Sequence, residues 1–280
     1  MKYQEISHKN KKQNNAKTQK KESIMINPFV KGKNIFRNYV NISNKINRKL
    51  AITIFLYMII NIMTMKFNNV RRLESQYSYI TVTINEKGTQ SFLSSSFKLC
   101  PDEVYVNDIK VEGEVCKKTA LSEETNRIKI VFQNEINSTY YMFYKLYNIK
   151  EIDLSHFNSS LVTNMKYMFS YCYRLTSIDF TNIDTSSVTS MEFMFQRCLS
   201  LSSIDLSGFN TSKVTSMKDM FNTCRYLASL DFSSFDTSSV QNMDSMFWNC
   251  SRLTSLNLEK FDTSQVTSMN KCSIMENLLI

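Results

Sequence analysis

The sequence repeats itself every 26 residues from about Ile136 to Val266, and this period limits the possible folds more than any other feature. The four copies that begin at Val162 carry Val, Met, a Met-Phe pair, Cys and Leu at the same positions, and an earlier, weaker copy begins at Ile136. A unit this short cannot bury its apolar side chains alone, so several units must stack around a continuous core. The recurring valines are Val162, Val188, Val214, Val240 and Val266.

The spacing within a unit predicts one helical segment followed by one short strand. Apolar residues follow the pattern of one helix face, as in Val162, Met165 and Cys172. Apolar and polar residues then alternate, as in a strand, over residues 175–180. We therefore expect an α/β repeat fold, a solenoid with parallel strands, over residues 136–266.

The regular methionines and cysteines raise the question of a metal or redox site, because soft sulfur ligands suit Cu(I). Each cysteine, however, shares the inward positions of its unit with Phe and Leu, where a thiol behaves as a small hydrophobe. Successive copies also lie one repeat apart instead of surrounding one point. We expect core packing and no metal site for Cys172, Cys198, Cys224 and Cys250.

The polar residues of the predicted strands form a candidate binding face, because strand alternation turns them toward solvent. Like charges stacked about 4.8 Å apart are unfavourable in a sheet. The face is therefore either solvated and screened, or it meets cations or donor-rich ligands. The Asp-Thr-Ser segments that follow are expected to serve as turns and caps. The candidate face consists of Asp153, Ser177, Asp179, Thr181, Ser203, Asp205, Ser207, Ser229, Asp231 and Ser233.

The N-terminal part combines a basic segment with one apolar segment. Residues 1–49 hold thirteen Lys or Arg against two Glu, which is typical of a basic disordered tail. Residues 50–65 are uncharged, and the basic flank before them predicts an N-terminus inside and a C-terminal portion outside. The segment is shorter than the about 20 residues of a comfortable membrane span. A signal anchor, a signal-peptide h-region and a buried core helix all remain open, and we expect a single-pass cell-membrane protein or, alternatively, a secreted one.

Residues 68–135 are expected to form a β-rich N-terminal cap on the repeats. Alternating runs at residues 79–84, 104–111 and 127–132 predict its strands. Cys100 and Cys116 flank the second run, and in an exported protein they are a candidate disulfide. Four Asn-x-Ser/Thr matches are candidate glycosylation sites in such a protein. They begin at Asn137, Asn158, Asn210 and Asn249.

The residues that enzymes and nucleic-acid-binding proteins need are missing from the pattern. The net charge is +9, but the basic residues of the tail account for it, and the repeats carry no basic stripe for a phosphate backbone. The two histidines are His8, in the tail, and His156, which has no counterpart in the other repeats. No nucleophile motif or phosphate-binding glycine loop is present. We expect no enzyme activity, no cofactor and no nucleic-acid partner.

The units resemble the BspA-like family of leucine-rich-repeat surface proteins over roughly the last 140 residues, as in residues 175–198. The resemblance implies a right-handed solenoid, surface exposure and a role in adhesion or protein binding. No lipobox cysteine follows the apolar segment, so a lipid anchor is not expected. Cys272 and Ser273 replace the expected Met and Phe, and residues 267–280 are interpreted as a truncated repeat or a C-terminal cap.

These features together favour a recognition module with a protein or glycan ligand, tethered to a membrane through residues 50–65 or secreted. The alternative is a structural or decayed repeat protein that has no ligand of its own.

Overall fold

The computed structural model describes residues 53–54, 56–61, 77–113, 115–254, 256 and 258–272. The chain divides into two compact parts, Met1–Leu73 and Glu74–Ile280. The predicted basic tail over residues 1–49 lies outside the described residues.

In the part Met1–Leu73, the described residues between 53 and 61 are helical. Among the residues that the structure describes, no helix has the length and apolar character needed to cross a bilayer. This finding contradicts the predicted membrane anchor at residues 50–65 and the predicted single-pass cell-membrane location.

The part Glu74–Ile280 begins with antiparallel strands that pair through alternating β-formers. β1 (Ser78–Ile84) pairs along its whole length with β6 (Asn126–Phe132), and β6 pairs on its other side with β3 (Glu103–Val106). β4 (Ile109–Lys110) is the edge strand beside β3. Ile80, Val82, Ile84, Ile128 and Ile130 are fully buried, so apolar burial holds this region together.

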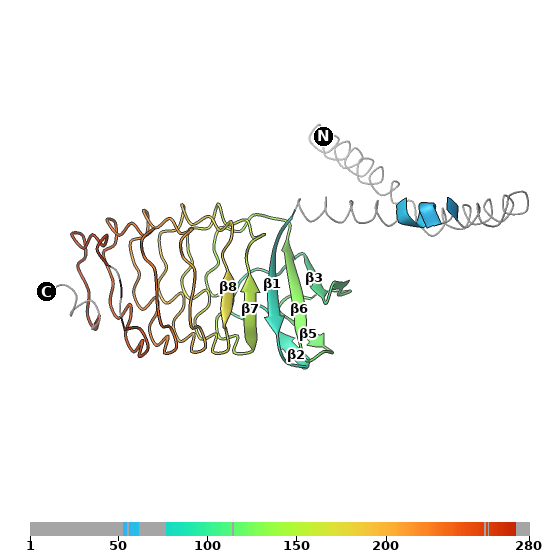
Figure 1. Cartoon of the computed structure of the whole chain (residues 1–280), viewed down its shortest axis with the longest axis horizontal. Helices are drawn as coiled ribbons and strands as arrows, with labels where there is room; N and C mark the ends of the chain where they lie inside the picture. The colour runs from blue at the N-terminus through green and yellow to red at the C-terminus, as the bar shows by residue number, and fades with distance from the viewer. Residues whose placement is uncertain are drawn as a thin grey trace, which may run out of the picture. The chain divides into compact units, whose positions relative to one another are not determined.

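The same sheet continues into the repeats. β1 also pairs antiparallel with β7 (Ile149–Asp153), and β7 pairs parallel with β8 (Ser177–Asp179), which gives the six-stranded order β4-β3-β6-β1-β7-β8 (Figure 1). A separate two-stranded sheet joins β2 (Gly88–Ser91) to β5 (Lys118–Leu121). The strand β1 therefore covers the edge that the first repeat would otherwise leave unpaired.

Residues 136–265 form five successive units of 26 residues, here called the first to fifth unit, which lie side by side in Figure 1. Residues 26 apart form parallel bridges from one unit to the next. The bridges join Ser138 to Asn164, and the series continues through Ser190, Ser216, Asn242 and Ser268.

The backbone before each predicted strand is a run of turns and not a helix. The amide of Met168 donates to the Met165 carbonyl at 3.3 Å, which closes a local turn. The next amide, of Phe169, donates to the Met194 carbonyl of the following unit at 2.9 Å. Tyr167 and Tyr171 have φ values of 57° and 65°, which no right-handed helix contains.

The predicted α/β leucine-rich-repeat-type solenoid is therefore wrong. The described part of the chain is β-rich, with a mixed six-stranded sheet, a small two-stranded sheet and almost no helix. Among the described residues, the predicted strand is present only as β7 and β8, and residues 203–205 of the third unit, for example, form no strand. The apolar spacing was misleading because turns closed by bonds between residues three apart also place every third or fourth side chain inward.

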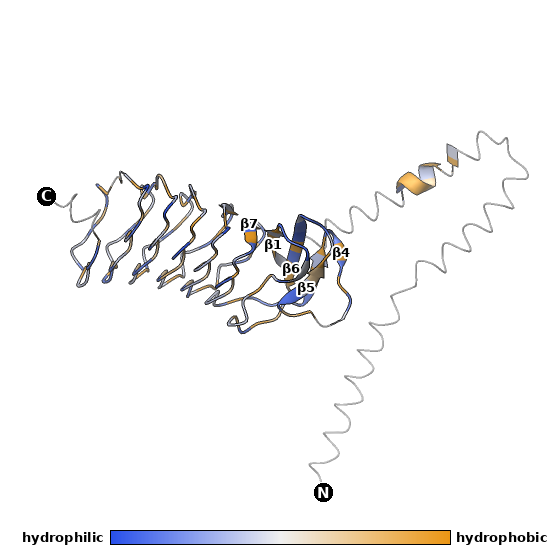
Figure 2. Cartoon of the chain, turned by 90° about the horizontal axis from the view of Figure 1, so that it is seen from below, coloured by the Kyte–Doolittle hydropathy of each residue, from blue (hydrophilic) through white to orange (hydrophobic). Residues whose placement is uncertain are grey.

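Hydrophobic residues recur along the backbone of the units (Figure 2), and their buried side chains form one core with columns that run from unit to unit. The rings of Phe143, Phe169, Phe195, Phe221 and Phe247 stack with centroids 5.3 to 5.9 Å apart. The recurring methionines beside them are fully buried. Each cysteine thiol donates to a phenylalanine carbonyl of the preceding unit, at 3.0 to 3.2 Å.

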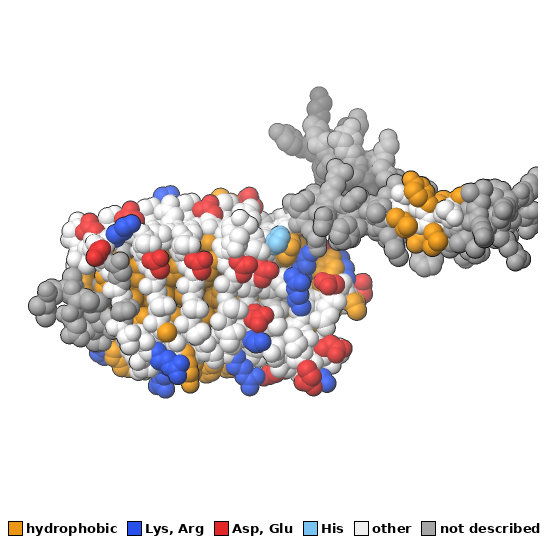
Figure 3. Space-filling model, viewed as in Figure 1, with side chains coloured by type: hydrophobic (Ala, Val, Ile, Leu, Met, Phe, Trp, Pro, Cys, Tyr) orange, Lys and Arg blue, Asp and Glu red, His pale blue; other side chains and the backbone are white. Residues whose placement is uncertain are grey.

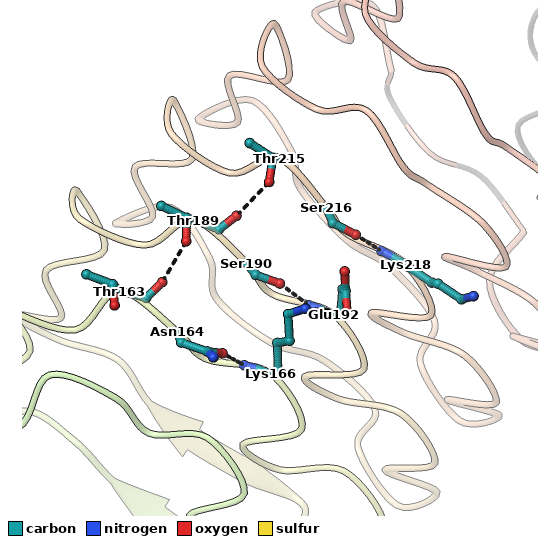
Figure 4. A network of polar contacts seen from close by, with 9 residues as sticks. All are labelled: Thr163, Asn164, Lys166, Thr189, Ser190, Glu192, Thr215, Ser216 and Lys218. Carbon is teal, nitrogen blue, oxygen red and sulfur yellow. Dashed lines mark hydrogen bonds and ion pairs between the residues drawn. The ribbon is translucent and has the colours of Figure 1, made fainter.

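Threonine hydroxyls tie neighbouring units together near the surface. In one ladder, Thr189 donates to the Thr163 carbonyl at 3.1 Å and Thr215 donates to the Thr189 carbonyl at 3.2 Å (Figure 4). In the Asp-Thr-Ser segments, the buried Thr185 donates to the Asn210 carbonyl and accepts from the Asn210 amide. The polar residues of the repeats thus carry much of the pairing that a regular sheet would supply.

Candidate binding surface

The predicted Ser/Asp face lies on the outside of the repeats. Asp153 and Asp179 are register partners in the β7–β8 pair. Asp179, Asp205 and Asp231 are exposed, and Figure 3 shows acidic side chains in a row across the units. The remaining members of the face are also exposed, and they are Ser177, Thr181, Ser203, Ser207, Ser229 and Ser233.

The carboxylates of this face hold local turns. Oδ1 of Asp179 accepts from the Thr181 amide at 2.8 Å, and Oδ1 of Asp205 accepts from the Ser207 amide at 2.9 Å. Hydrogen bonds from the side chain and amide of Thr181 lower the pKa of Asp179, because they favour the charged form. The amide and side chain of Ser207 lower the pKa of Asp205 in the same way. The acidic row thus has a structural task in each of the first four units.

A second outward surface, which we call the tyrosine patch, spans the first three units. The ring of Tyr167 lies between those of Tyr141 and Phe193, at centroid distances of 4.9 and 4.4 Å. Further rings pack on this row at tilted or edge-on angles. The patch consists of Tyr140, Tyr141, Tyr144, Tyr167, Tyr171 and Phe193, together with Lys145 and Arg197.

Many patch residues sit where the backbone is left-handed in every unit. Tyr141, Tyr167 and Phe193 have φ between 57° and 62°, and Asp219 and Ser245 occupy the same position in later units. The second such position holds Lys145, Tyr171, Arg197, Thr223 and Asn249. Asn and Asp tolerate this conformation, whereas bulky side chains are unfavourable in it. The first three units therefore place bulky side chains where smaller polar ones are easier to accommodate.

Two tyrosines of the patch have shifted pKa values, and two cations lie beside the patch rings. A hydrogen bond with Tyr140, together with burial, raises the pKa of Tyr141 to about 12, and burial raises the pKa of Tyr167 to about 12. The Lys145 ammonium lies 5.0 Å from the Tyr144 ring centroid, and the Arg197 guanidinium lies 5.3 Å from that of Tyr171. The patch thus combines hydroxyl groups, aromatic surface and positive charge.

A pocket of about 380 Å³ lies beside the patch, between β2 and the first two units. Oε1 of Gln90 accepts from the Asn148 side chain at 2.8 Å, and Arg174 forms an ion pair with Glu86. The ring of Tyr147 stacks on that of Tyr173 at 4.9 Å. The pocket is lined by Glu86, Thr89, Gln90, Ser91, Lys145, Leu146, Tyr147, Asn148 and Arg174.

The sequence interpretation missed this patch, although a signal for it exists. Seven of the fourteen tyrosines lie between residues 140 and 173, and Tyr141 and Tyr167 occupy the same column of the repeat. The interpretation followed only the columns that recur in every unit. A column that is aromatic in the first units and polar in the later ones does not stand out in such an alignment.

Comparison with known proteins assigns the chain to a family by its repeats. Residues 120–230 and 175–275 match a family described as Mycoplasma protein of unknown function, DUF285. Together the two matches cover more than half of the chain. The chain belongs to the DUF285 family. The assignment to the BspA-like leucine-rich-repeat family is therefore wrong, and no curated protein or solved structure matches the chain.

The DUF285 match contains the whole tyrosine patch and both left-handed positions of every unit. Strands β1 to β4 and the β2 side of the pocket precede residue 120 and lie outside the match. The pocket therefore combines family residues with residues of the preceding β-rich region.

The cysteines of this DUF285 chain divide into two kinds. Cys100 and Cys116 form a disulfide with a Cα–Cα distance of 4.7 Å. The repeat cysteines are unbridged and buried, and desolvation raises the pKa of Cys250 to about 12. The described residues contain no group of three or more His, Cys, Asp or Glu side chains that is arranged to hold a metal ion.

The four candidate glycosylation residues Asn137, Asn158, Asn210 and Asn249 are all exposed. Two of them also hold local turns. Oδ1 of Asn158 accepts from the Ser160 hydroxyl at 2.8 Å, and Oδ1 of Asn210 accepts from the Ser212 hydroxyl at 2.8 Å.

Proposed function

We propose that this DUF285 chain is a recognition module that binds a protein or glycan ligand through the tyrosine patch. The observation that carries the proposal is the placement of bulky residues at left-handed positions of the first three units. Backbone strain of this kind costs of order 1–3 kcal/mol per residue and is typical of functional positions. Later units of the same stack hold Asp219 and Ser245 there, so stacking of the units does not require an aromatic ring.

The composition of the patch supports a binding role. Tyrosine and arginine are enriched at protein interfaces and among the residues that dominate binding energy. A tyrosine ring gives a ligand a large contact area, and its hydroxyl gives the ligand a hydrogen bond. The patch has several such rings within one continuous surface, with Lys145 and Arg197 beside them.

Several other sets of recurring residues in the repeats have structural roles, so they are weaker candidates for a binding surface. The Met, Phe, Cys and Leu columns are buried in the core. The threonine ladders and Asp-Thr-Ser segments hydrogen-bond between units, and the Asp row holds turns. These structural roles do not extend to the tyrosine patch.

The disulfide supports a location outside the reducing interior of the cell. Disulfides form and persist in oxidising environments and are rare in the cytosol. The Cys100–Cys116 bond lies in the β-rich region that leads into the repeats. We therefore include secretion in the proposal, and N-terminal sequencing of the protein recovered from culture medium tests it.

The binding proposal is tested on a glycan array and a panel of purified cell-surface proteins. The test variant is Tyr141→Asn/Tyr167→Asn, which removes two rings and places a residue that favours φ > 0 at each position. The matched control is Ser245→Asn, at the same position of the fifth unit. We expect specific capture by the wild type and by Ser245→Asn, and at least a tenfold loss in the double variant.

The alternative is a structural repeat protein without a ligand, and the mutual stacking of the patch rings favours it. A well-folded wild-type chain that captures nothing on either panel would establish this alternative. Capture that is unchanged in a folded Tyr141→Asn/Tyr167→Asn variant would exclude the tyrosine patch as the binding surface.

A further inference from the structure

The pocket between β2 and the first two units has a composition that differs from the rest of the repeats. Planar amides of Gln90 and Asn148, hydroxyls of Thr89 and Ser91, and the ring of Tyr147 line it. Its volume of about 380 Å³ is near the lower end of the range of about 300–1,000 Å³ for small-ligand pockets. The pocket suits one compact polar ring better than an extended peptide.

The charges of the pocket favour an anion. Lys145 and Arg174 are positive, and Glu86 is the one carboxylate among the lining residues, so the lining has a net charge of one positive unit. Arg174 is ion-paired with Glu86, which orients its guanidinium at the edge of the pocket. A guanidinium has five N–H donors, so an ion pair with one carboxylate does not exhaust it.

The aromatic ring of the pocket is fixed in position and accessible. Tyr147 is 47% exposed and stacks on Tyr173, the residue at the same position of the next unit. The amide of Asn148, the next residue, is held by Gln90 of β2. A ring platform next to oriented amide, hydroxyl and cationic donors has the chemistry to bind a sugar, whose C–H face packs on the aromatic ring while its hydroxyls hydrogen-bond to the rim.

We infer that this pocket binds a carboxylate-bearing sugar residue of a glycan. The inference rests on the proposed recognition function and specifies the ligand at the edge of the tyrosine patch. The sugar ring packs on Tyr147, its hydroxyls meet the amides of Asn148 and Gln90, and its carboxylate lies between Lys145 and Arg174. The charge-assisted bonds to the carboxylate distinguish this ligand from a neutral sugar.

The test compares methyl β-glucuronide with methyl β-glucoside on the full chain by ligand-observed NMR titration. The two probes have the same ring and differ by a carboxylate in place of a hydroxymethyl group. We expect the glucuronide to bind at least about tenfold more tightly, because hydrogen bonds to a charged group contribute most. Equal affinity, or no binding of the glucuronide, overturns the inference.

Variants locate the site. Arg174→Gln and Lys145→Gln are each expected to weaken glucuronide binding about tenfold or more. The matched control is Arg252→Gln, which removes an arginine from the same position of the fifth unit, where it lies over the Tyr226 ring at 4.5 Å. Glu86→Gln is expected to strengthen glucuronide binding, because it removes the competing carboxylate; weaker binding in that variant contradicts anion recognition here.

Two further outcomes separate this inference from the proposed function. Loss of array capture in Tyr141→Asn/Tyr167→Asn, with no glucuronide binding, retains the recognition function and overturns the sugar pocket. An acidic peptide that binds the chain and is weakened by Arg174→Gln, while the glucuronide does not bind, assigns the pocket to a peptide ligand and also overturns the inference.

Discussion

At the scale of single residues, the left-handed backbone positions decide which side chains a unit accepts at little cost. Asp219 shows the consequence of placing an acid there, since it has a φ of 55° and is only 8% exposed. Desolvation raises its pKa, and the nearby charges of Asp244 and Glu192 raise it further. A hydrogen bond from Asn222 opposes this shift without cancelling it.

We predict that Asp219→Asn stabilises the protein at neutral pH. An acid whose pKa is raised by folding takes up protons on folding, so its charged form destabilises the folded state as pH rises through the raised pKa. Asn keeps the Oδ1 acceptor for Asn222 and tolerates φ > 0. Thermal unfolding by circular dichroism should show a higher melting temperature at neutral pH, and the difference should vanish at acidic pH. A lower melting temperature in the variant at neutral pH would contradict this reading.

The acidic row has the opposite pH behaviour. The pKa values of Asp179, Asp205 and Asp231 are lowered by hydrogen bonds from the residue two positions on, so they stabilise the fold above their unfolded pKa. That stability is lost as the pH falls through the lowered pKa values. We expect Asp179→Asn/Asp205→Asn/Asp231→Asn to keep the turn acceptors, remain folded and lose less stability on acidification than the wild type. Melting temperatures measured across an acid series check this, and equal slopes would refute it.

At the scale of elements, the run of turns splits its backbone hydrogen bonds between two directions. Alternate amides close turns within the unit, and the amides between them reach the next unit. The phenylalanine column follows the second direction, so each ring between the two ends of the column lies against the rings of two neighbouring units. Phe195 is fully buried and stacks at 5.4 Å on Phe169 and at 5.3 Å on Phe221.

We predict that Phe195→Ala lowers the free energy of unfolding by about 3–5 kcal/mol, because it removes a buried ring and leaves a cavity. Leu161→Ala is the control, since Leu161 is 48% exposed and its change should stay within about 0.5 kcal/mol. Urea unfolding followed by circular dichroism measures both. A loss below about 1 kcal/mol in Phe195→Ala would show that the column does not hold the units together.

Sequence patterns predict which columns are buried but not the backbone conformation of the residues that form them. Val188, Met191, Phe195 and Cys198 are fully buried, as their inward spacing indicates. Inward side chains three or four residues apart fit a helix and also a run of turns closed by bonds between residues three apart, so the spacing does not distinguish the two. The left-handed residues are also invisible, because Tyr and Phe are poor indicators of φ > 0. The tyrosine patch was missed for a related reason, since its columns change chemistry between the third and fourth units.

At the scale of the whole part Glu74–Ile280, the β-rich region and the repeats share one sheet through the β1–β7 pair. The disulfide lies at the far side of that sheet, where Cys100 precedes β3 and Cys116 follows β4. The β-rich region also supplies one edge of the pocket, since Glu86 follows β1 and Gln90 lies in β2. Stability of the β-rich region and geometry of the pocket are therefore linked.

We predict that Cys100→Ser/Cys116→Ser lowers the free energy of unfolding by about 3 kcal/mol, the value expected for a closed loop of this length, here a separation of 16 residues. Chemical unfolding of the wild type with and without reductant should give the same difference. The same variant at a temperature where it is folded should still bind array ligands, because the tyrosine patch lies in the repeats. Unchanged stability in the reduced protein would mean that the bond does not constrain the unfolded chain.

In the runs of turns, the hydrogen bonds that join each pair of neighbouring units are nearly identical from the first unit to the fifth. Copies of such a unit are interchangeable, so unequal recombination between them adds or removes whole units without creating a new junction. Because the tyrosine patch lies in the first three units and the pocket lies between β2 and the first two units, the number of units beyond the third can vary while the candidate ligand contacts stay the same. The later units then act as a spacer whose length evolution can change in steps of one unit, separately from the choice of ligand.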